Sequence, residues 1–378
     1  MNNPTSVLNR PPIRILQISY GMDRGGAETL IMNIYRNMDR TRVQFDFLLH
    51  DKNKTAYEDE IKELGGRIYH IPRFLGYNKY FYDRNLKNFL IAHPEHHIIH
   101  DHLMDSAKET FKVAKKLNRI TIAHSHIVQY YKKPSDFIRF FFRRNLYKYS
   151  DYRFACSKEA GEWLYRKKAD FIILNNGIDT EKYRYSEKIR NKKRKEFTID
   201  EKTILITNIG RMVEQKNQKR LLDIFSIFHS FNKNSNLIIV GKGPLEAELR
   251  NHAAKLKIEH NVLFLGERND VNEILIASDL FLLPSLFEGL GIVLIEAEAT
   301  GLHSVLSDNI PSEANLIPDL MTRVSLKKDN EEWIRKIKEA ISTQHHCREK
   351  QYLTIKHLDY DIQGCAKKMQ EFYLSIIH

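Results

Sequence analysis

Short apolar runs of strand length recur along the whole chain, and segments of helical length separate them. In the first half these runs occupy 13–19, 45–49, 67–71, 97–101, 120–123, 152–155 and 171–174. In the second half they occupy 203–209, 236–240, 262–265, 280–283 and 304–307. Regular alternation of strands with helices is typical of doubly wound parallel sheets, whose two faces are covered by helices. The predicted fold class is therefore α/β, with Rossmann-like sheets.

The length of the chain predicts more than one hydrophobic core. Its 378 residues exceed the range in which a single core usually keeps growing. A turn cluster at 175–179 precedes the most polar stretch, 181–202, which we interpret as a linker. We therefore place one Rossmann-like domain at 1–180, a second at 181–360 and a terminal helix at 361–378.

Charge and cysteine content narrow the class of partner and the compartment. The formal net charge of +12 favours an acidic partner, namely phosphate, nucleic acid or an anionic membrane. Cys156, Cys347 and Cys365 lie far apart without a C-x-x-C pair, which indicates a reducing environment and argues against a zinc cluster. The polar start at 1–12 is unlike a signal peptide, and no apolar run approaches membrane-spanning length, so we expect any membrane contact to be peripheral.

A basic run, Lys192-Lys193-Arg194-Lys195, raises the alternative of a nucleic-acid-binding protein. No aromatic platform interleaves this run, and no nucleic-acid-binding motif accompanies it. We therefore predict a solvated helix here and no nucleic acid partner.

Two carboxylates bracket a glycine-rich turn in the second half. After an apolar run the chain reads Pro284-Ser285-Leu286-Phe287-Glu288-Gly289-Leu290-Gly291-Ile292-Val293-Leu294-Ile295-Glu296-Ala297, the pattern of a tight turn and a helix. Gly289 and Gly291 would leave backbone N–H groups open to an anion at the helix N-terminus. With Glu288 just before the helix, Glu296 would follow after about 12 Å of axial rise, roughly the span from the sugar to the ribose of a nucleoside diphosphate sugar. The alternative is an ordinary amphipathic helix with two solvated glutamates.

Two further turns of the second half suit a nucleotide. Arg211 follows the strand at 203–209, and Lys216 follows in the next turn. A planar guanidinium fork and a point charge are a suitable pair for the α- and β-phosphates. Gly241 and Gly243 come after the strand at 236–240, where a turn without side chains lets a nucleotide approach the backbone.

The first half opens with a glycine turn and carries a histidine pair. Gly25 and Gly26 precede a helical segment, so they would place backbone N–H groups at its N-terminus. They do not form G-x-G-x-x-G, so the chain lacks the fingerprint of a nicotinamide-dependent enzyme.

A histidine pair lies later in the first half. His124 and His126 follow an apolar strand, at whose carboxyl end open α/β sheets bind ligands. A purely structural histidine is the alternative for each.

Aromatic and cationic side chains alternate between Tyr130 and Tyr149. The apolar residues of this segment share one helical face, and cationic residues flank it: Lys132, Lys133, Arg143 and Arg144. Apolar insertion with cationic attraction predicts an interfacial helix that contacts an anionic membrane surface. The alternative is a core-facing helix with snorkelling arginines.

The sequences of these motifs resemble those of a known family. The segments G-G-A-E, A-H-S-H, F-A-C-S-K, N-N-G-I-D, G-R with Q-K-N, and F-E-G-L-G-I-V-L-I-E-A stand in one order along the chain. Their order is similar to that in retaining GT-B glycosyltransferases with an E-x7-E motif (family 4, group 1) of the bacterial exopolysaccharide and capsule type. The resemblance implies two Rossmann-like domains that face each other across a cleft. The first would bind the acceptor, the second the nucleotide sugar, and the terminal helix would return to the first.

The same resemblance assigns roles to residues. His124 would contact the donor sugar and Glu288 its hydroxyls, as the catalytic residues. The donor-binding residues would be Arg211, Lys216, Gly241, Gly243, Phe287, Gly289, Leu290, Gly291 and Glu296, with Glu296 on the ribose. The acceptor-side residues would be Gly25, Gly26 and His126. We expect no metal and no cofactor, because the two cations can neutralise the leaving diphosphate.

The implied reaction transfers a sugar from a nucleotide sugar, with a UDP-sugar favoured, to a hydroxyl of a lipid-linked saccharide, with retention of configuration. We expect the protein in the cytoplasm, peripherally on the inner face of the plasma membrane, in cell-envelope or extracellular polysaccharide synthesis. Two alternatives from other classes are a nucleotide-sugar 2-epimerase of GT-B fold and a non-catalytic carbohydrate- or membrane-binding protein.

Overall fold

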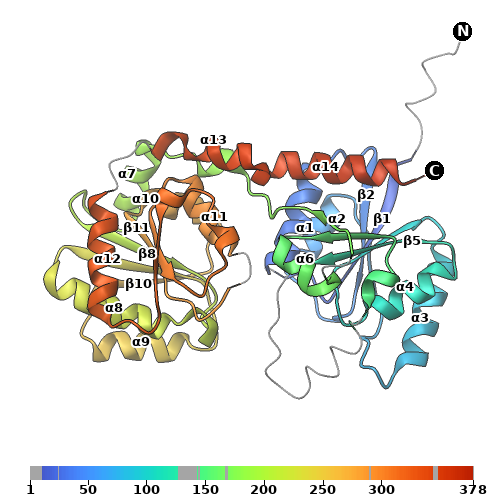
Figure 1. The fold of residues 1–378 in the computed structure, drawn as a ribbon, viewed down its shortest axis with the longest axis horizontal. Helices are drawn as coiled ribbons and strands as arrows, with labels where there is room; N and C mark the ends of the chain where they lie inside the picture. The colour runs from blue at the N-terminus through green and yellow to red at the C-terminus, as the bar shows by residue number, and fades with distance from the viewer. Residues whose placement is uncertain are drawn as a thin grey trace, which may run out of the picture. The chain divides into compact units, whose positions relative to one another are not determined.

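The computed structural model describes residues 11–23, 25–126, 143, 145–166, 169–288, 291–343 and 348–377. The chain divides into two compact units, each with its own sheet and helices (Figure 1). Unit 1 comprises Met1–Gly177 together with Ile362–His378, and unit 2 comprises Ile178–Asp361. The observed divisions thus fall at 177/178 and 361/362, where we expected 180/181 and 360/361.

Unit 1 is built on a seven-stranded sheet with the order β3-β2-β1-β4-β5-β6-β7, and every pair of neighbours is parallel. The strands are β1 (Ile13–Ser19), β2 (Val43–Leu49), β3 (Ile68–His70), β4 (Ile98–Asp101), β5 (Ile120–Ser125), β6 (Tyr152–Ala155) and β7 (Ile172–Ile173). Its described helices are α1 (Gly26–Asn37), α2 (Glu58–Glu63), α3 (Lys79–Ala92), α4 (Ala107–Lys115), η2 (Leu146–Lys148), α6 (Lys158–Tyr165) and α14 (Ile362–Ser375). This strand order is the doubly wound order of dinucleotide-binding sheets, whose ligands bind at the carboxyl edge.

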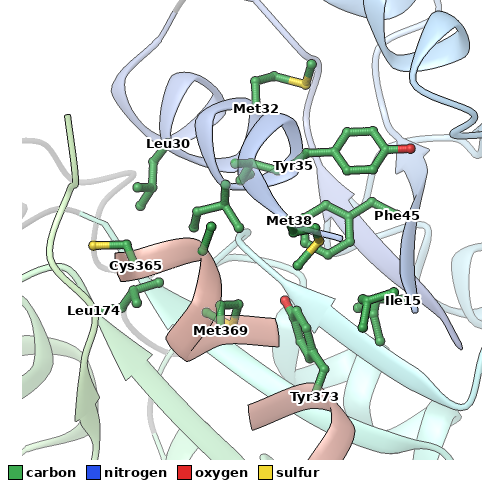
Figure 2. Close-up of a cluster of buried hydrophobic side chains, with 14 of the residues drawn as sticks. Ile15, Leu30, Met32, Tyr35, Met38, Phe45, Leu174, Cys365, Met369 and Tyr373 are labelled. Atoms are coloured by element: carbon green, nitrogen blue, oxygen red, sulfur yellow. The ribbon is translucent and has the colours of Figure 1, made fainter. Parts of the chain in front are cut away.

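The C-terminal helix α14 completes the hydrophobic core of unit 1. Figure 2 shows Cys365, Met369 and Tyr373 of this helix among buried side chains of α1, β1 and β2. Met369 and Tyr373 lie one helical turn apart, so they project from the same face of α14. Because the helix buries this face against α1 and the sheet, the last residues of the chain belong to the first core.

Unit 2 is built on a six-stranded parallel sheet with the order β10-β9-β8-β11-β12-β13. Its strands are β8 (Ile204–Ile209), β9 (Ser235–Val240), β10 (Val262–Gly266), β11 (Leu280–Leu283), β12 (Ser304–Ser307) and β13 (Met321–Val324). Its α-helices are α7 (Glu187–Glu196), α8 (Gln218–Phe231), α9 (Glu246–Lys255), α10 (Val271–Ala277), α11 (Ile292–Ala299), α12 (Asn330–Ser342) and α13 (Gln351–Ile355). Short helical turns are η3 (Thr180–Tyr183), η4 (Glu214–Lys216), η5 (Glu259–Asn261), η6 (Ser312–Ala314), η7 (Pro318–Leu320), η8 (Arg348–Lys350) and η9 (Lys356–Tyr360). The predicted class of two Rossmann-like α/β sheets is confirmed.

The stretch 181–202 is part of unit 2 and not a free linker. Its helix α7 buries Lys193 and Arg194, which are 4% and 2% exposed. Lys193 Nζ lies 2.6 Å from Asp270 Oδ2, and Arg194 Nη1 lies 3.1 Å from Asp279 Oδ2. The prediction of a solvated helix is therefore wrong, because acidic residues distant in the sequence neutralise these two cations.

Within the described ranges, none of the helices combines the length and the apolar character that crossing a bilayer requires.

Candidate functional site

The turns that follow β8 and β11 lie side by side at the carboxyl edge of the sheet in unit 2, because these two strands are parallel neighbours. The first turn carries Arg211 and Lys216, and the second carries Glu288. Lys216 Nζ lies 2.7 Å from Glu288 Oε1, and their side chains are 15% and 5% exposed. The structure thus pairs two residues that are 72 positions apart and that the sequence analysis had assigned to separate tasks.

Hydrogen bonds fix the two turns to each other. The N–H of Leu286 donates to the carbonyl of Gln215 at 2.8 Å, and the Gln215 side-chain amide donates to the carbonyl of Phe287 at 3.0 Å. The side-chain amide of Asn217 donates to the carbonyl of Pro284 at 3.0 Å. Because these bonds hold the backbone on both sides of the ion pair, the fold sets the backbone positions of Lys216 and Glu288.

Two cations at this edge remain available to an anion. The Arg211 side chain is exposed and makes no hydrogen bond or ion pair within the part of the chain that the structure describes. Lys242, which follows β9, is also exposed and has no such partner among the described residues. The turns after β8 and β9 are in contact, because the N–H of Met212 donates to the carbonyl of Lys242 at 3.0 Å. Lys242 was not among the residues predicted from the sequence, although its place between two glycines was a usable signal.

Gly241 and Gly243 are required by close backbone contacts. Gly241 has a φ of +128°, and a Cβ there would lie 2.2 Å from the carbonyl oxygen of Gly210. A Cβ on Gly243 would lie 2.2 Å from the carbonyl oxygen of Met212. The contact between the β8 and β9 turns therefore accounts for both glycines, and their role in binding a donor stays a prediction.

The turn before α11 differs from the expected geometry. The helix begins at Ile292, and Gly291 precedes it with a φ of +67°, a left-handed conformation that favours glycine. Glu288 therefore lies on the turn, four positions before the helix and not directly at its start. The axial-rise estimate between the two glutamates does not apply to this stretch. Phe287 beside it is 43% exposed, whereas Gly289 and Leu290 lie outside the described residues.

Glu296 projects from the second turn of α11 and meets a residue that the sequence analysis missed. Its Oε1 accepts a hydrogen bond from the Tyr183 hydroxyl at 2.7 Å. Burial raises the pKa of Glu296 to about 7, and the hydrogen bond from Tyr183 opposes this shift. Near neutral pH this carboxyl is therefore partly protonated. No local signal pointed to Tyr183, which is 113 positions away in the sequence.

Glu298, on the same helix, has a structural role. It is fully buried, and its Oε1 accepts hydrogen bonds from the N–H groups of Leu316 and Ile317 at 3.0 and 2.6 Å. Burial raises the pKa of Glu298 to about 8, against the two backbone hydrogen bonds. The helix thus holds two carboxyls of raised pKa with different partners.

In unit 1 two histidine pairs lie at the carboxyl ends of the neighbouring strands β4 and β5. The ring centroids are 4.1 Å apart for His124 and His126, 4.4 Å for His100 and His102, and 5.2 Å for His100 and His124. Only the β5 pair was predicted from the sequence. The same H-x-H spacing at the end of β4 was the signal for the second pair, since alternate residues of a strand share one face.

The four imidazoles form a connected and neutral group. His102 Nδ1 lies 2.7 Å from His126 Nε2, and His102 Nε2 lies 2.8 Å from Gln17 Oε1. Burial lowers the pKa of His100 to about 3 and that of His126 to about 4, and it holds the pKa values of His102 and His124 well below 6.5. Near neutral pH these rings are therefore hydrogen-bonding groups and not cations.

The acceptor-side glycines lie at the start of α1. Gly25 caps this helix in an extended conformation with a φ of −87°, and Gly26 is exposed with open space where its side chain would be. A Cβ on Gly25 would lie 2.3 Å from Oε2 of Glu28. The Glu28 carboxylate thus already lies at the helix N-terminus that was expected to attract an anion.

One of the predicted membrane contacts is buried. Arg143 is 6% exposed, its Nε donates to Asp105 Oδ1 at 2.7 Å, and its guanidinium lies 5.6 Å from the Trp163 ring centroid. The prediction that Arg143 contacts a membrane is therefore wrong, because a carboxylate and an aromatic ring of unit 1 already hold it. The other predicted contacts lie outside the described residues: Lys132, Lys133 and Arg144.

Both halves of the chain match glycosyltransferase families. Residues 24–182 match the model described as Glycosyltransferase Family 4, and residues 189–354 match Glycosyl transferases group 1. The chain is 31% identical over 365 residues to EpsF of Bacillus subtilis (strain 168), which is named as a glycosyltransferase. This similarity covers 94% of the chain and 95% of EpsF.

Two further relatives carry more specific names. CapH of Staphylococcus aureus, a capsular polysaccharide biosynthesis glycosyltransferase, is 24% identical over 96% of this chain and 99% of its own. The UDP-Gal:alpha-D-GlcNAc-diphosphoundecaprenol alpha-1,3-galactosyltransferase of Escherichia coli is 33% identical over 40% of this chain and 39% of its own.

A solved structure supports the fold. Anabaena HepE in complex with UDP and glucose matches 96% of this chain and 100% of its own, with a TM-score of 0.77 and 17% sequence identity. HepE and this chain thus share two Rossmann-like sheets despite their distant sequences. The chain therefore belongs to the family 4, group 1 glycosyltransferases and has the GT-B fold.

Proposed function

We propose that this glycosyltransferase moves a sugar from a UDP-sugar to a hydroxyl of a lipid-linked saccharide, with retention, in cell-envelope or extracellular polysaccharide synthesis. The observation that carries the proposal is the carboxyl edge of unit 2, where the turn after β8 carries both the exposed Arg211 and the Lys216 that pairs with Glu288. Two relatives support its finer parts. HepE is seen with UDP and glucose, and the Escherichia coli relative acts, by its name, on a diphosphoundecaprenol-linked sugar.

The diphosphate would bind by replacing Glu288 as the partner of Lys216. Without donor, Lys216 is paired with Glu288 at 2.7 Å. A bound diphosphate carries two formal negative charges, which attract this ammonium group. Its oxygens can also accept two parallel hydrogen bonds from the planar Arg211 guanidinium. Lys216 then turns to the phosphates, and Glu288 becomes free to accept hydrogen bonds from hydroxyls of the sugar.

The same cations would stabilise the leaving group. As the bond from the sugar to the diphosphate breaks, negative charge grows on the phosphate oxygens. Fixed cations at that place lower the energy of the transition state without a metal ion on the diphosphate. We therefore propose that transfer requires neither a metal nor a cofactor. The retaining outcome is proposed from the E-x7-E motif that Glu288 and Glu296 form.

Unit 1 would supply the remaining contacts. His124, neutral near pH 7, would exchange a hydrogen bond with the donor sugar, and Gly25, Gly26 and His126 would line the acceptor side. We further propose that the protein works in the cytoplasm, peripherally on the membrane. The aromatic and cationic residues between Tyr130 and Tyr149 support this, with Lys132, Lys133 and Arg144 as the contacting cations.

A donor and acceptor screen tests the proposal. The purified chain is incubated with UDP-glucose, UDP-galactose, UDP-N-acetylglucosamine or GDP-mannose, with and without a polyprenyl-diphosphate-linked N-acetylhexosamine in detergent. We expect acceptor-dependent release of UDP, insensitive to a chelator, and an α-linked product by NMR. Release of GDP alone would contradict the UDP donor, and a β-linked product would contradict retention. A donor epimer formed without acceptor would identify an epimerase, and no donor consumption would indicate a binding protein.

A further inference from the structure

Three imidazoles of unit 1 converge on one point. His100 and His102 come from the end of β4, and His124 comes from β5 beside it. One ring nitrogen from each lies within 4.8 Å of one from each of the others. His100 and His124 lie on adjacent parallel strands, and His102 follows directly after the last residue of β4, so the sheet positions the three rings.

Several nitrogens of this group lack the partner that burial demands. His124 is 2% exposed, and neither of its ring nitrogens has a hydrogen-bond partner among the described residues. His100 is 1% exposed, and its Nε2 is also without a partner there. A buried polar atom without a partner costs about 1–3 kcal/mol, so three such atoms together point to a ligand.

Two other ring nitrogens of the group are held by oxygen atoms. His100 Nδ1 lies 2.6 Å from the Tyr373 hydroxyl, and His102 Nε2 lies 2.8 Å from Gln17 Oε1. Gln17 also donates to the Tyr373 hydroxyl at 3.2 Å. In the tautomers that donate to these oxygens, His100 Nε2 keeps a free lone pair. The lone pair of His102 Nδ1 accepts from His126 Nε2 at 2.7 Å, a hydrogen bond that a metal ion would replace. Histidines that bind metals are oriented in this way by an oxygen acceptor on the second nitrogen.

We propose that His100, His102 and His124 form a binding site for a divalent transition-metal ion of the zinc class. Zn²⁺ takes imidazole nitrogens at about 2.0–2.1 Å, which separates two ligand atoms by about 3.4 Å. The three rings therefore have to turn inward from their present spacing. Three protein ligands leave a fourth position open for water or for a substrate oxygen. His126 would give up its hydrogen bond to His102 Nδ1 on metal binding, because Gln17 holds the other nitrogen of His102.

This ion would differ from a counter-ion of the diphosphate. Imidazole suits Zn²⁺, Cu²⁺ and Ni²⁺, whereas Mg²⁺ and Mn²⁺ prefer oxygen ligands. The site also lies in unit 1, whereas Arg211 and Lys216 belong to unit 2. One consequence rests on the proposed function: since His124 would contact the donor sugar, a bound metal that takes one of its nitrogens should reduce transfer.

Binding is tested on the full chain after treatment with a chelator and dialysis. Co²⁺ is added as a spectroscopic probe, and Zn²⁺ affinity is measured by competition with a chromophoric chelator. We expect one Co²⁺ per chain, a visible absorption band typical of a nitrogen-rich site of low coordination number, and its loss when Zn²⁺ is added. His100→Asn and His102→Asn should each lower Zn²⁺ affinity at least tenfold.

A matched control removes a histidine outside the group. His260 lies in unit 2 with 93% of its side chain exposed, so His260→Asn tests for binding to surface histidines. We expect this variant to bind Zn²⁺ as the native chain does. The proposed site would be overturned if His260→Asn lost as much Zn²⁺ affinity as the other two variants. It would also be overturned if neither His100→Asn nor His102→Asn lost any Zn²⁺ affinity.

A readout on the native chain avoids any dependence on how the variants fold. Zn²⁺ should raise the thermal unfolding midpoint of the native chain, and the absence of both this rise and the Co²⁺ band would refute the proposal. The outcome is independent of the proposed function. A chain that transfers sugar but binds no Co²⁺ refutes only the metal site, and a chain that binds Co²⁺ but transfers nothing refutes only the proposed reaction.

Discussion

The carboxyl edges of the two sheets have the same topology and opposite chemistry. In unit 2 the edge presents charges: the exposed Arg211 and the Lys216–Glu288 pair. In unit 1 the same edge presents the neutral rings of His100 and His124, which are almost fully buried. Both edges follow parallel strands in a doubly wound order, so the backbone alone does not decide what binds there.

This contrast teaches that one repeated fold can present two chemically different binding edges. A charged, partly exposed edge suits an anion such as a diphosphate, because exposed cations keep their charge over the whole physiological range. A buried, neutral edge suits uncharged hydroxyls or a metal ion, because its rings exchange hydrogen bonds or lone pairs. The two edges should therefore respond differently to mutation and to pH.

The largest expected effect is on nucleotide binding to the charged edge. Lys216→Ala should weaken UDP binding by about 1.5–3 kcal/mol, or about 10–150-fold, because a hydrogen bond to a charged group is lost. Isothermal titration calorimetry measures the UDP affinity of both proteins. The matched control is Lys219→Ala on α8, an exposed lysine three positions further along the chain. If both variants bind UDP as the native chain does, the charged edge is not the diphosphate site.

The next effect separates two carboxyls of α11 by their response to pH. Glu296 has a pKa of about 7, so its ionised fraction falls about tenfold between pH 8 and pH 6. If the ionised form accepts the ribose hydroxyls, the KM for a UDP-sugar should rise by about that factor as the pH falls, and Glu296→Gln should remove this dependence. A UDP-sugar is used because its diphosphate diester does not titrate in this range.

Glu298→Gln is the control for this measurement. Glu298 lies two positions further along the same helix, and its pKa is about 8. Glutamine keeps the oxygen that accepts from Leu316 and Ile317. The variant should therefore keep the pH dependence of the KM. A KM that varies equally with pH in Glu296→Gln and in the native chain would remove Glu296 from the donor site.

The architecture and the location of these sites followed from local signals. Apolar runs of strand length predicted the strands on which both edges are built. The turn before α11 was placed by Gly291, whose φ of +67° explains why glycine is there. The positions of Arg211, His124 and Glu288 at carboxyl edges were predicted because strand, turn and helix are all encoded within a few residues.

The side-chain pairs of these sites were not predictable, because the paired residues are distant in the sequence. Lys216 and Glu288 are 72 positions apart, so each was given its own task. Lys193 looked solvated since its partner Asp270 is 77 positions further on. His102 was overlooked although its H-x-H spacing with His100 was visible in the sequence, because its contact with His126 forms only when β5 pairs with β4.

A smaller effect is expected at the neutral edge. His124→Asn should lower kcat/KM by about 2–12-fold, the range for one neutral hydrogen bond, and should leave UDP affinity unchanged. The rate should show no titration of this ring between pH 6 and pH 8, because burial holds its pKa well below 6.5. The assay includes a chelator so that a metal cannot contribute.

The control here is His97→Asn, which changes an exposed histidine at the start of β4. It should transfer sugar at the native rate. A fall in UDP affinity in His124→Asn, as large as the fall in kcat/KM, would contradict a division of labour between a neutral and a charged edge.

The smallest effect is the most specific one, because its sign is opposite to that of a simple loss of contact. If Glu288 competes with the diphosphate for Lys216, then Glu288→Gln frees the ammonium and should raise UDP affinity by about 2–5-fold, the value of a modest ion pair. The same variant should lower kcat, since it weakens the acceptor for sugar hydroxyls. Glu214→Gln is the matched control, because it removes an exposed carboxylate from the same turn as Lys216 and should change UDP affinity less. Weaker UDP binding in Glu288→Gln would show that Glu288 positions Lys216 for the phosphates, so that the pair assists the nucleotide instead of competing with it.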